Sequence, residues 1–353
     1  MSIKNIILLV IVAILALAII YAQYDSGKSH DRIDIKLCLK AGESHKIRYT
    51  QFVGISQRWE DRGSDSNQTT DIIFTLSTNS VDANGVMNTA MTFNSIKLGI
   101  ETPYGYLEFN PEKPLIGKTD PNNNYQQAFN TLFSTITGSS LNLIIASTGE
   151  VLTITGIEDI FTKFKKEMTK LDAKNEPNNP EQKEMLEALK KAMGASYEKE
   201  YREFFYKLFN EQQIREITDA AIMKFPDTFA VVGRSWQYKQ NLNIGYPFDV
   251  NTIYKIEQHN NGIAYIDTIS KLDMDKLKVV DITARDKILM KLSGTINSTA
   301  EVEETTGLLK KSDARMKLSG IQRVEPDKMM LPIRPNMNIQ LKLDGYTTVE
   351  LLR

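Results

Sequence analysis

The stretch ITGSSLNLIIASTGEVLTITG, residues 136–156, has the pattern of a strand, a Thr-Gly turn and a second strand. Glycine adopts the positive φ that tight turns need, and short apolar runs between such turns are typical of strands. A second stretch, LSGTINSTAEVEETTGLLKKSDARMKLSG at residues 292–320, has the same order of features. Thr-Gly hairpins about 150 residues apart indicate that one β-unit occurs twice.

Each Thr-Gly hairpin follows another hairpin, which has an Asn-Gly pair at its tip. The pairs are Asn84-Gly85 and Asn261-Gly262, each between alternating apolar and polar residues. Asn-Gly suits the two-residue type I′ turn. A strand-like segment precedes each hairpin, at residues 39–51 and 231–244. The order of leading strand, Asn-Gly hairpin and Thr-Gly hairpin therefore occurs twice, which favours tandem duplication over chance repetition of common β-motifs.

The turn type predicts the register of both Asn-Gly hairpins. Pairing Ala83 with Val86 gives one apolar face, made of Ile72, Phe74, Leu76, Met87, Met91 and Phe93. Pairing Asn260 with Ile263 gives a second apolar face, made of Tyr254, Ile256, Ile263, Tyr265 and Ile269. A third two-residue hairpin is predicted at Asp344-Gly345 near the C-terminus.

Helical periodicity separates the two β-rich parts. Four amphipathic helices are predicted between residues 157 and 226, and one stripe contains Ile157, Ile160, Phe161, Phe164, Met168 and Leu171. Asn179 followed by Pro180 predicts the start of the second helix. The third carries an aromatic stripe of Tyr197, Tyr201, Phe204, Phe205 and Leu208, and the fourth begins at an Asn cap.

The first β-rich part contains additional elements. Residues 61–68 are polar and predict a loop, two more strands are expected around residues 102–105, and a short helix with Phe129, Leu132 and Phe133 on one side follows. The predicted organisation is a hydrophobic segment at 1–22, a polar stalk at 23–33, a first β-rich unit at 34–156, a helical insert at 157–226 and a second β-rich unit at 227–353. The predicted fold class is α+β, with two related antiparallel β-units.

Residues 1–22, MSIKNIILLVIVAILALAIIYA, contain one charge, at Lys4, ahead of an apolar run. This run fits either an uncleaved signal anchor or a signal peptide cut after Ala18 or Ala22, and the bulk of Ile20 favours the anchor. Either alternative predicts that residues after about 23 lie outside the cytoplasm, at the cell membrane or, after cleavage, secreted.

Composition limits the chemistry. The 353 residues include 43 Lys and Arg against 44 Asp and Glu, which leaves no basic footprint for nucleic acid. The single cysteine, Cys38, allows no intramolecular disulfide, and its alternation with Ile35 and Leu37 predicts a packed thiol. The three histidines, His30, His45 and His259, are far apart in the sequence.

Several candidate sites have simpler interpretations. The acidic group Glu60, Asp61, Asp65 and Asp71 lacks the spacing of a calcium loop. Ser293 and Ser319 precede glycines and fit turns, whereas Glu301, Glu303 and Glu304 fit the solvent side of a strand. Trp236 fits a core position better than a ligand platform, and Trp59 remains a second possible platform. We assign no catalytic, cofactor-binding or metal-ligating residue, and no cofactor.

The chain resembles an uncharacterised family of exported bacterial β-rich proteins, many of them lipoproteins. The resemblance rests on VVGRSWQY at 231–238, on the Gly-bounded strand pairs at 138–156 and 294–320, and on SIKLGIETPYGYLEFN at 95–110. It implies an extracytoplasmic β-rich body and no enzyme activity. This chain has no lipid-attachment cysteine directly after its hydrophobic run.

The sequence thus predicts a membrane-anchored or exported, non-catalytic envelope protein that binds an apolar ligand or an envelope protein. Residues 1–22 would contact the membrane. The alternatives are a hydrolase with an unrecognised site and a purely structural surface protein. The best position for an apolar ligand is the space between the aromatic stripe at residues 197–208 and the sheet.

Overall fold

The computed structural model describes residues 32–103, 105–112, 124–174, 198–243, 247–282, 286–326 and 335–352. The strands are β1 (Arg32–Ile33), β2 (Ser44–Trp59), β3 (Arg62–Val81), β4 (Met87–Thr102), β5 (Gly105–Phe109), β6 (Ser140–Ile145), β7 (Val151–Thr155), β8 (Ala230–Val231), β9 (Ser235–Asn243), β10 (Pro247–Asn260), β11 (Ile263–Asp273), β12 (Lys278–Ile282), β13 (Asp286–Glu303), β14 (Leu309–Pro326) and β15 (Met337–Leu352). The helices are α2 (Asn124–Ile136), α3 (Ile157–Lys174) and α5 (Glu211–Ala221), and residues 198–208 are also helical.

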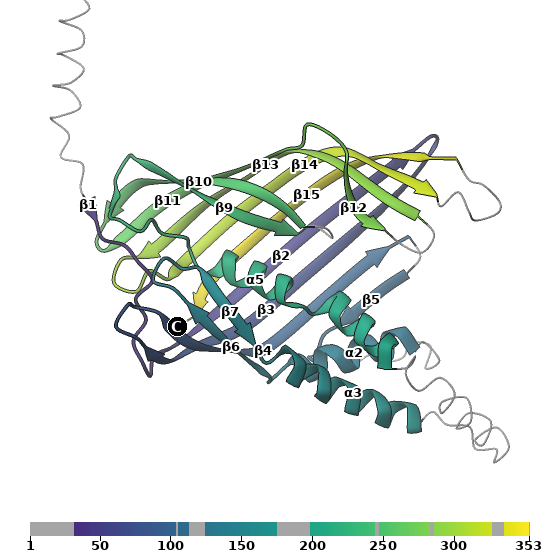
Figure 1. Ribbon diagram of the computed structural model, residues 1–353, viewed down its shortest axis with the longest axis horizontal. Coiled ribbons are helices and arrows are strands. Elements are labelled where there is room, and N and C mark those ends of the chain that lie inside the picture. Colours follow the sequence, from purple (N-terminus) through teal and green to yellow (C-terminus); the bar gives the residue numbers. More distant parts are fainter. Residues whose placement is uncertain are drawn as a thin grey trace, which may run out of the picture.

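One 13-stranded antiparallel sheet confirms the predicted fold class (Figure 1). Its order is β7-β6-β4-β3-β2-β15-β14-β13-β11-β10-β9. The first unit, β7-β6-β4-β3-β2, and the second, β14-β13-β11-β10-β9, place their leading strand, Asn-Gly hairpin and Thr-Gly hairpin in the same spatial order. The repeated order in the sequence is therefore also a repeated order in the sheet.

β15 joins the two units, because it pairs with β14 on one side and with β2 on the other. It is continuous from Met337 to Leu352, so the predicted hairpin at Asp344-Gly345 is wrong. The backbone of β2 instead approaches Gly345 closely, since a Cβ at this position would lie 2.6 Å from the Phe52 carbonyl oxygen. The Asp-Gly pair thus marks close packing of strands and not a turn.

The first Asn-Gly hairpin has the predicted apolar face but a different turn. Asp82 and Val86 close a three-residue loop, in which only Gly85 has a positive φ, of 76°. The Asp82 carboxylate accepts hydrogen bonds from the amides of Asn84 and Val86, which stabilises this longer loop. All six predicted face residues are at most 7% exposed.

The second Asn-Gly hairpin has the predicted turn but a different face. Asn260 pairs with Ile263, and Asn261 and Gly262 have φ values of 51° and 73°. A β-bulge between Ile256 and Gln258 then shifts the register by one residue. Tyr265 and Ile269 consequently lie on the outer face, 37% and 43% exposed, which corrects the prediction.

Two further predictions are wrong. Residues 62–68 belong to β3 and not to a loop, because they pair with β2 as far as a tight turn at Glu60 and Asp61. Cys38 is exposed, since the buried residues around it are the odd-numbered ones from Ile33 to Leu39. Cys38 is even-numbered, so its side chain lies on the opposite, exposed side of this segment.

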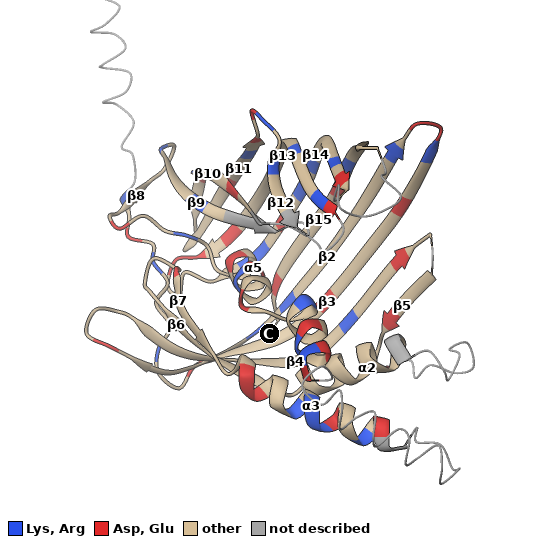
Figure 2. Cartoon of the chain, turned by 45° about the vertical axis from the view of Figure 1, so that its right-hand side comes forward, with Lys and Arg blue, Asp and Glu red and all other residues tan. Residues whose placement is uncertain are grey.

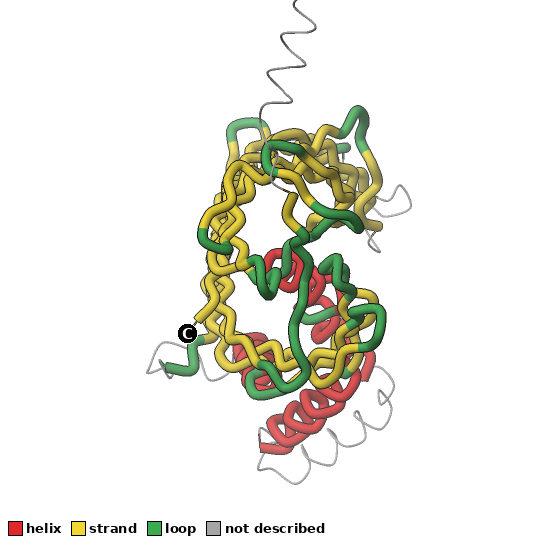
Figure 3. Tube along the Cα trace, turned by 90° about the vertical axis from the view of Figure 1, so that its left-hand side faces the viewer, coloured by secondary structure: helices red, strands yellow, loops and turns green. Residues whose placement is uncertain are grey.

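We define the inner face of the sheet as the one that carries its buried apolar residues. The sheet is curved and has helices within the curve (Figure 3), and α5 lies over its inner face. A large apolar cluster packs the first unit and the near end of the second unit against α2, α3 and α5. A smaller cluster fills the inner face at the far end of the second unit, with Leu292, Leu318 and Leu343 among its members.

The segment before β2 connects corresponding turns of the two units. Leu37 donates its backbone N–H to Ser147 at 2.8 Å, and Cys38 donates to Thr306 at 2.8 Å. Ser147 lies in the β6–β7 turn and Thr306 in the β13–β14 turn. We call residues 33–39 the strap.

The helix predicted to begin at Asn179 and Pro180, the hydrophobic segment at 1–22 and most of the predicted stalk lie outside the described residues. Within the residues that the structure describes, none of the helices is long and apolar enough to cross a membrane. Acidic and basic residues are interspersed along the sheet and α3, as expected for a net charge of −1 (Figure 2).

Candidate functional site

A cavity of about 200 Å³ lies between α5 and the inner face of the sheet. Its floor comes from strands of the second unit and from β15 and β2, and its roof comes from Glu216, Asp219, Ala220 and Met223. The apolar walls include Val250, Ile296, Leu309 and Val349. The cavity therefore lies where the two β-units meet beneath one helix.

A row of polar and small side chains crosses the floor. Residues that are paired in register lie side by side on one face of a sheet. The row follows seven neighbouring strands and consists of Tyr254, Thr268, Ser298, Ala314, Thr347, Gln51 and Thr70. It separates the two apolar clusters of the inner face. We call it the polar row.

Hydroxyl groups beside the polar row are buried and bonded to one another. Thr252 is 2% exposed, and its hydroxyl lies 2.7 Å from that of Ser270, which is 7% exposed. The Thr252 hydroxyl also donates to Gln240 Oε1 at 2.9 Å, and Thr268 and Ser298 are 2.6 Å apart. Because buried polar groups are stable only when paired, these contacts fix the floor in one arrangement.

Two polar side chains of the lining keep free hydrogen-bonding capacity. Neither the Gln51 amide nor the Ser312 hydroxyl forms a hydrogen bond with another residue that the structure describes. Gln51 offers two N–H donors and one carbonyl acceptor, and Ser312 offers one donor and an acceptor. The cavity thus presents unused polar groups beside apolar walls.

The roof is held by a capping box at the start of α5. Asn210 Oδ1 accepts from the Gln213 backbone amide at 3.0 Å, and Gln213 Oε1 accepts from the Asn210 amide at 3.0 Å. This cap was expected from the sequence, and it fixes the helix position from which Glu216 and Asp219 reach the cavity.

The carboxylates of the roof influence nearby tyrosines. Burial raises the pKa of the Tyr49 phenol, and the charge of Glu216 raises it further. Burial likewise raises the pKa of Tyr254, with a smaller contribution from Asp219. Both phenols therefore stay neutral hydrogen-bonding groups at physiological pH.

A buried ion pair lies behind the roof. Lys224 is 2% exposed and its Nζ lies 2.6 Å from Asp219 Oδ1. The same Nζ donates to the Gly149 carbonyl oxygen at 2.5 Å, and Trp236 Nε1 donates to the Lys224 carbonyl oxygen at 3.0 Å. Lys224 thus links the β6–β7 turn at one edge of the sheet to β9 at the other.

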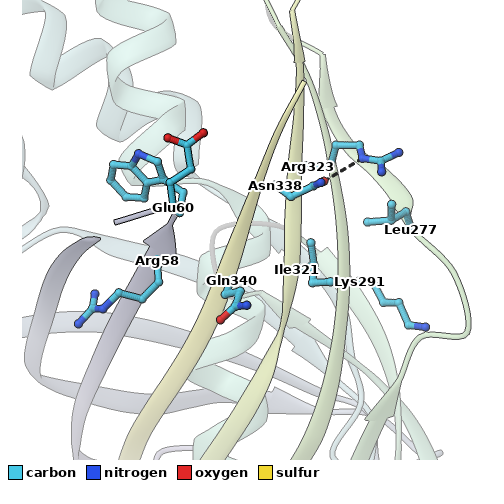
Figure 4. Close-up of a pocket in the computed structure, with 9 residues that line it drawn as sticks. Arg58, Glu60, Leu277, Lys291, Ile321, Arg323, Asn338 and Gln340 are labelled. Carbon is cyan, nitrogen blue, oxygen red and sulfur yellow. Dashed lines mark hydrogen bonds between the residues drawn. The ribbon is translucent and has the colours of Figure 1, made fainter. Parts of the chain in front are cut away.

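A second, larger groove of about 390 Å³ lies at the far end of the strands (Figure 4). Its lining consists of Arg58, Trp59, Glu60, Leu277, Lys291, Ile321, Arg323, Asn338 and Gln340. Most of these residues alternate with the buried residues of the smaller apolar cluster and so belong to the outer face. We call it the distal groove.

The space expected for an apolar ligand is filled. Phe205, from the aromatic stripe, is 0% exposed and packs edge to face on Phe161 and Phe209. Phe164, also 0% exposed, stacks on Phe204 with ring centroids 6.1 Å apart. Close packing leaves no room for a ligand between these rings.

The other singled-out residues are dispersed. Asp65 and Asp71 pair with Arg58 and Arg48 on the outer side of β3. His45 lies 3.6 Å from Glu43, and His259 lies 3.1 Å from Glu304 at a hairpin tip. Within the described ranges, no three His, Cys, Asp or Glu side chains are grouped as metal ligands.

Trp236 is partly buried and stacks on Tyr254 with ring centroids 5.3 Å apart. The polar row was missed because serine and threonine in alternating strands suggest solvent exposure. The alternation of charged residues in β11 could have revealed the polar row. Asp267, Lys271 and Asp273 mark the outer face, so Thr268 and Ser270 must face inward with Ile266 and Leu272.

No curated protein sequence matches the chain. Among solved structures, it is similar to one described as "lipid-protein interactions in lipovitellin", at 10% identity and a TM-score of 0.38, over 89% of this chain and 25% of the other. The chain thus spans about a quarter of that protein's length. An outer membrane channel from Pseudomonas putida F1 is similar at 8% identity and a TM-score of 0.17, over 91% and 99% of the two chains. At these TM-scores neither likeness supports an inference about function.

One family profile matches this sequence twice, at residues 84–197 and 181–309. Each match covers part of one β-unit and part of the helical insert, which suggests repetition and agrees with the predicted resemblance to an uncharacterised family. Because the two matches together cover more than half of the 353 residues, the chain belongs to the family of unknown function DUF6263.

Proposed function

We propose that this protein is a non-catalytic binding protein on the extracytoplasmic side of a membrane, and that it holds an amphipathic small molecule beneath α5. The observation that carries the proposal is the combination of a polar row, whose residues are buried or partly buried, with apolar walls in one cavity. Ligand sites are typically apolar pockets in which a few fixed polar groups provide orientation.

The lining supports a ligand with a polar end and a short apolar body. Gln51 and Ser312 supply hydrogen bonds, and Ile296, Leu309 and Val349 supply apolar contact. The polar end would be neutral or positively charged, because the Glu216 carboxylate lines the cavity and would repel an anion, whereas Asp219 is paired with Lys224. A volume near 200 Å³ suits a small molecule or one end of a longer one.

The arrangement of the hydroxyls supports binding over hydrolysis. A serine or threonine nucleophile needs a base within hydrogen-bond reach. The hydroxyls of Thr252, Ser270, Thr268 and Ser298 bond to one another or to Gln240. Neither His45 nor His259 belongs to the lining. A hydrolase stays the second candidate only if turnover depends on this cavity.

The extracytoplasmic part of the proposal rests on the hydrophobic run at residues 1–22. Alkaline phosphatase, which requires an oxidising compartment, should be active when fused after Arg353. A reporter that is active only in the cytoplasm should give no signal at the same position, and the reverse result would refute this topology.

Ligand retention can be tested with a variant that fills the cavity. Ala314 lies in the polar row, so Ala314→Leu should occupy the space, whereas Thr299→Leu places the same side chain on the outer face of β13. Native mass spectrometry of the gently extracted full chain should detect a bound small molecule in the wild type and in Thr299→Leu, but not in Ala314→Leu.

Equal retention by all three proteins, or no bound molecule in the wild type, would contradict the proposal. Circular dichroism would first establish that both variants are folded. If Ala314→Leu instead abolished an ester-hydrolysing activity present in Thr299→Leu, the hydrolase alternative would replace the binding proposal.

A further inference from the structure

The distal groove is built on a straight row of paired residues. Arg58, Gln340, Ile321 and Lys291 oppose one another in register on β2, β15, β14 and β13. They therefore lie side by side on the outer face, the opposite side of the sheet from the polar row. Arg323 is paired with Asn338 next to this row.

The two ends of the groove differ in charge. At one end, Arg58 binds both carboxylate oxygens of Asp65 at 2.8 and 3.0 Å, and Glu60 lies nearby (Figure 4). This guanidinium is neutralised by a local carboxylate. The other end contains Lys291 and Arg323 and has the larger share of positive charge.

Lys291 keeps binding capacity at this end. Its Nζ donates to the Asp275 carbonyl oxygen at 3.0 Å and lies within salt-bridge distance of no carboxylate in the part of the chain that the structure describes. An ammonium group has three donors, so two remain for a ligand.

Arg323 and Gln340 complete a set of donors. Arg323 Nε donates to Asn338 Oδ1 at 3.0 Å, which fixes the plane of the guanidinium, and its Nη1 is 3.9 Å from Glu325. Glu325 also lies 4.0 Å from Lys287, so this one carboxylate is shared between two cations. The Gln340 amide has no hydrogen-bond partner among the described residues.

Apolar surface adjoins these donors. Ile321 is 44% exposed although it lies in the middle of a four-strand row, and Leu277 lines the same end. An exposed isoleucine between lysine and glutamine provides a flat apolar contact for the part of a ligand next to its charged group.

We propose that the Lys291–Arg323–Gln340 end of the distal groove binds an oxyanion, a phosphate or carboxylate, carried on an apolar body that packs on Ile321 and Leu277. Lys and Arg donors form strong charge-assisted hydrogen bonds to such groups. This site differs from the cavity beneath α5 in location and in the charge of the ligand that it prefers. Each proposal can therefore be refuted without affecting the other.

The oxyanion could come from a soluble metabolite or from a lipid headgroup. Along β13, Lys291 lies roughly 40 Å from the strand end at Glu303, near which the strap crosses. The groove is thus remote from the end of the sheet near which β1 and the strap lie (Figure 1). A soluble alkyl phosphate and an anionic vesicle are therefore separate arms of the test.

The test uses isothermal titration of the full chain with hexyl phosphate, with inorganic phosphate as the probe that lacks the apolar body. Hexyl phosphate should bind saturably and at least tenfold more tightly than inorganic phosphate, because only the former contacts Ile321 and Leu277. Lys291→Gln combined with Arg323→Gln should weaken hexyl phosphate binding by about a hundredfold.

Lys317→Gln is the control, since it removes one charge from the outer face of β14 at a position outside the groove lining. It should change affinity less than twofold. Equal losses in Lys317→Gln and the double variant, or no binding of hexyl phosphate, would overturn the proposal.

Vesicles of phosphatidylglycerol and of phosphatidylcholine identify the source of the oxyanion. Binding to phosphatidylglycerol that the double variant loses would assign a lipid headgroup. Saturable hexyl phosphate binding without vesicle binding would assign a soluble ligand. Vesicle binding that the double variant retains, together with unchanged hexyl phosphate binding, would refute the site.

Discussion

Leu37 donates its backbone N–H to the carbonyl oxygen of Ser147 at 2.8 Å, and the next residue along the strap makes the equivalent bond to Thr306. The two acceptors lie in the Thr-Gly turn of the first unit and in its counterpart in the second. A single extended segment therefore connects corresponding turns of the two units. The strap thus makes one backbone hydrogen bond to each copy of the repeated β-unit.

This relationship predicts that Gly307 is essential for stability. Its φ is 69°, and a Cβ would lie 2.2 Å from the Lys36 carbonyl oxygen in the strap. Gly307→Ala should lower the free energy of unfolding by about 3 kcal/mol, since backbone strain and a clash with backbone act together. Urea denaturation of the full chain measures this loss.

Gly262→Ala provides the matched control. Gly262 has a φ of 73°, but no atom lies within 4 Å of the position that a Cβ would take, so only the conformational cost of about 1 kcal/mol applies. Equal losses in the two variants would show that the strap contact contributes nothing beyond the turn.

The sequence predicted the order of elements better than their faces. Asn261-Gly262 specified its turn because both positions need a positive φ, whereas Asn84-Gly85 did not, because Asp82 stabilises a longer loop. Local turn chemistry can therefore be predicted, but competing side-chain hydrogen bonds alter it.

The pairing of strands that are distant in the sequence could not be predicted, for a different reason. The bulge after Ile256 changes which residues of β11 pair with β10, and the Asn-Gly turn alone does not predict this shift. Gly345 lacks a side chain because Phe52, nearly 300 residues earlier, approaches it. The cavity is built from the neighbouring strands β10, β11, β13, β14, β15 and β2 under α5, so it too depends on long-range pairing.

The Lys224–Asp219 pair predicts unequal effects of removing its two members. Asp219→Asn leaves a 2% exposed ammonium without its counterion and should destabilise the protein by about 3 kcal/mol. Lys224→Met keeps the length of the side chain and leaves a carboxylate that is 28% exposed and can be hydrated, so about 1 kcal/mol is expected.

A double-mutant cycle separates the pair from other effects. The variant that carries both substitutions should be less destabilised than Asp219→Asn alone, because no buried charge is left. If Lys224→Met proved more harmful than Asp219→Asn, its bond to Gly149 would be the dominant contact.

The capping box predicts that Asn210 controls the roof of the cavity. Asn210→Ala should lower the free energy of unfolding by about 1 kcal/mol, because the Gln213 amide loses its acceptor. Asn210→Asp retains an acceptor and adds a negative charge at the helix N-terminus, so it should restore most of this loss. Thermal unfolding of the three proteins tests this ranking, and an equal loss in the aspartate variant would exclude capping as the cause.

The tyrosines around α5 predict a loss of stability at alkaline pH. Burial, followed by the charge of Glu150, raises the pKa of Tyr238 to about 12, and burial also raises the pKa values of Tyr49 and Tyr254. An unfolded tyrosine has a pKa near 10, so the unfolded state releases these protons first as the pH rises. The stabilisation is therefore complete below about pH 10 and is lost as the pH approaches 12 and above.

Absorbance at 295 nm during alkaline titration reports tyrosinate formation, and circular dichroism followed in parallel reports unfolding. The late-titrating phenols should ionise together with the unfolding transition. Tyr49→Phe should make stability fall less steeply above pH 10, because one proton fewer separates the folded and unfolded states. An unchanged slope in Tyr49→Phe would mean that Tyr49 ionises in the folded protein as readily as in the unfolded chain.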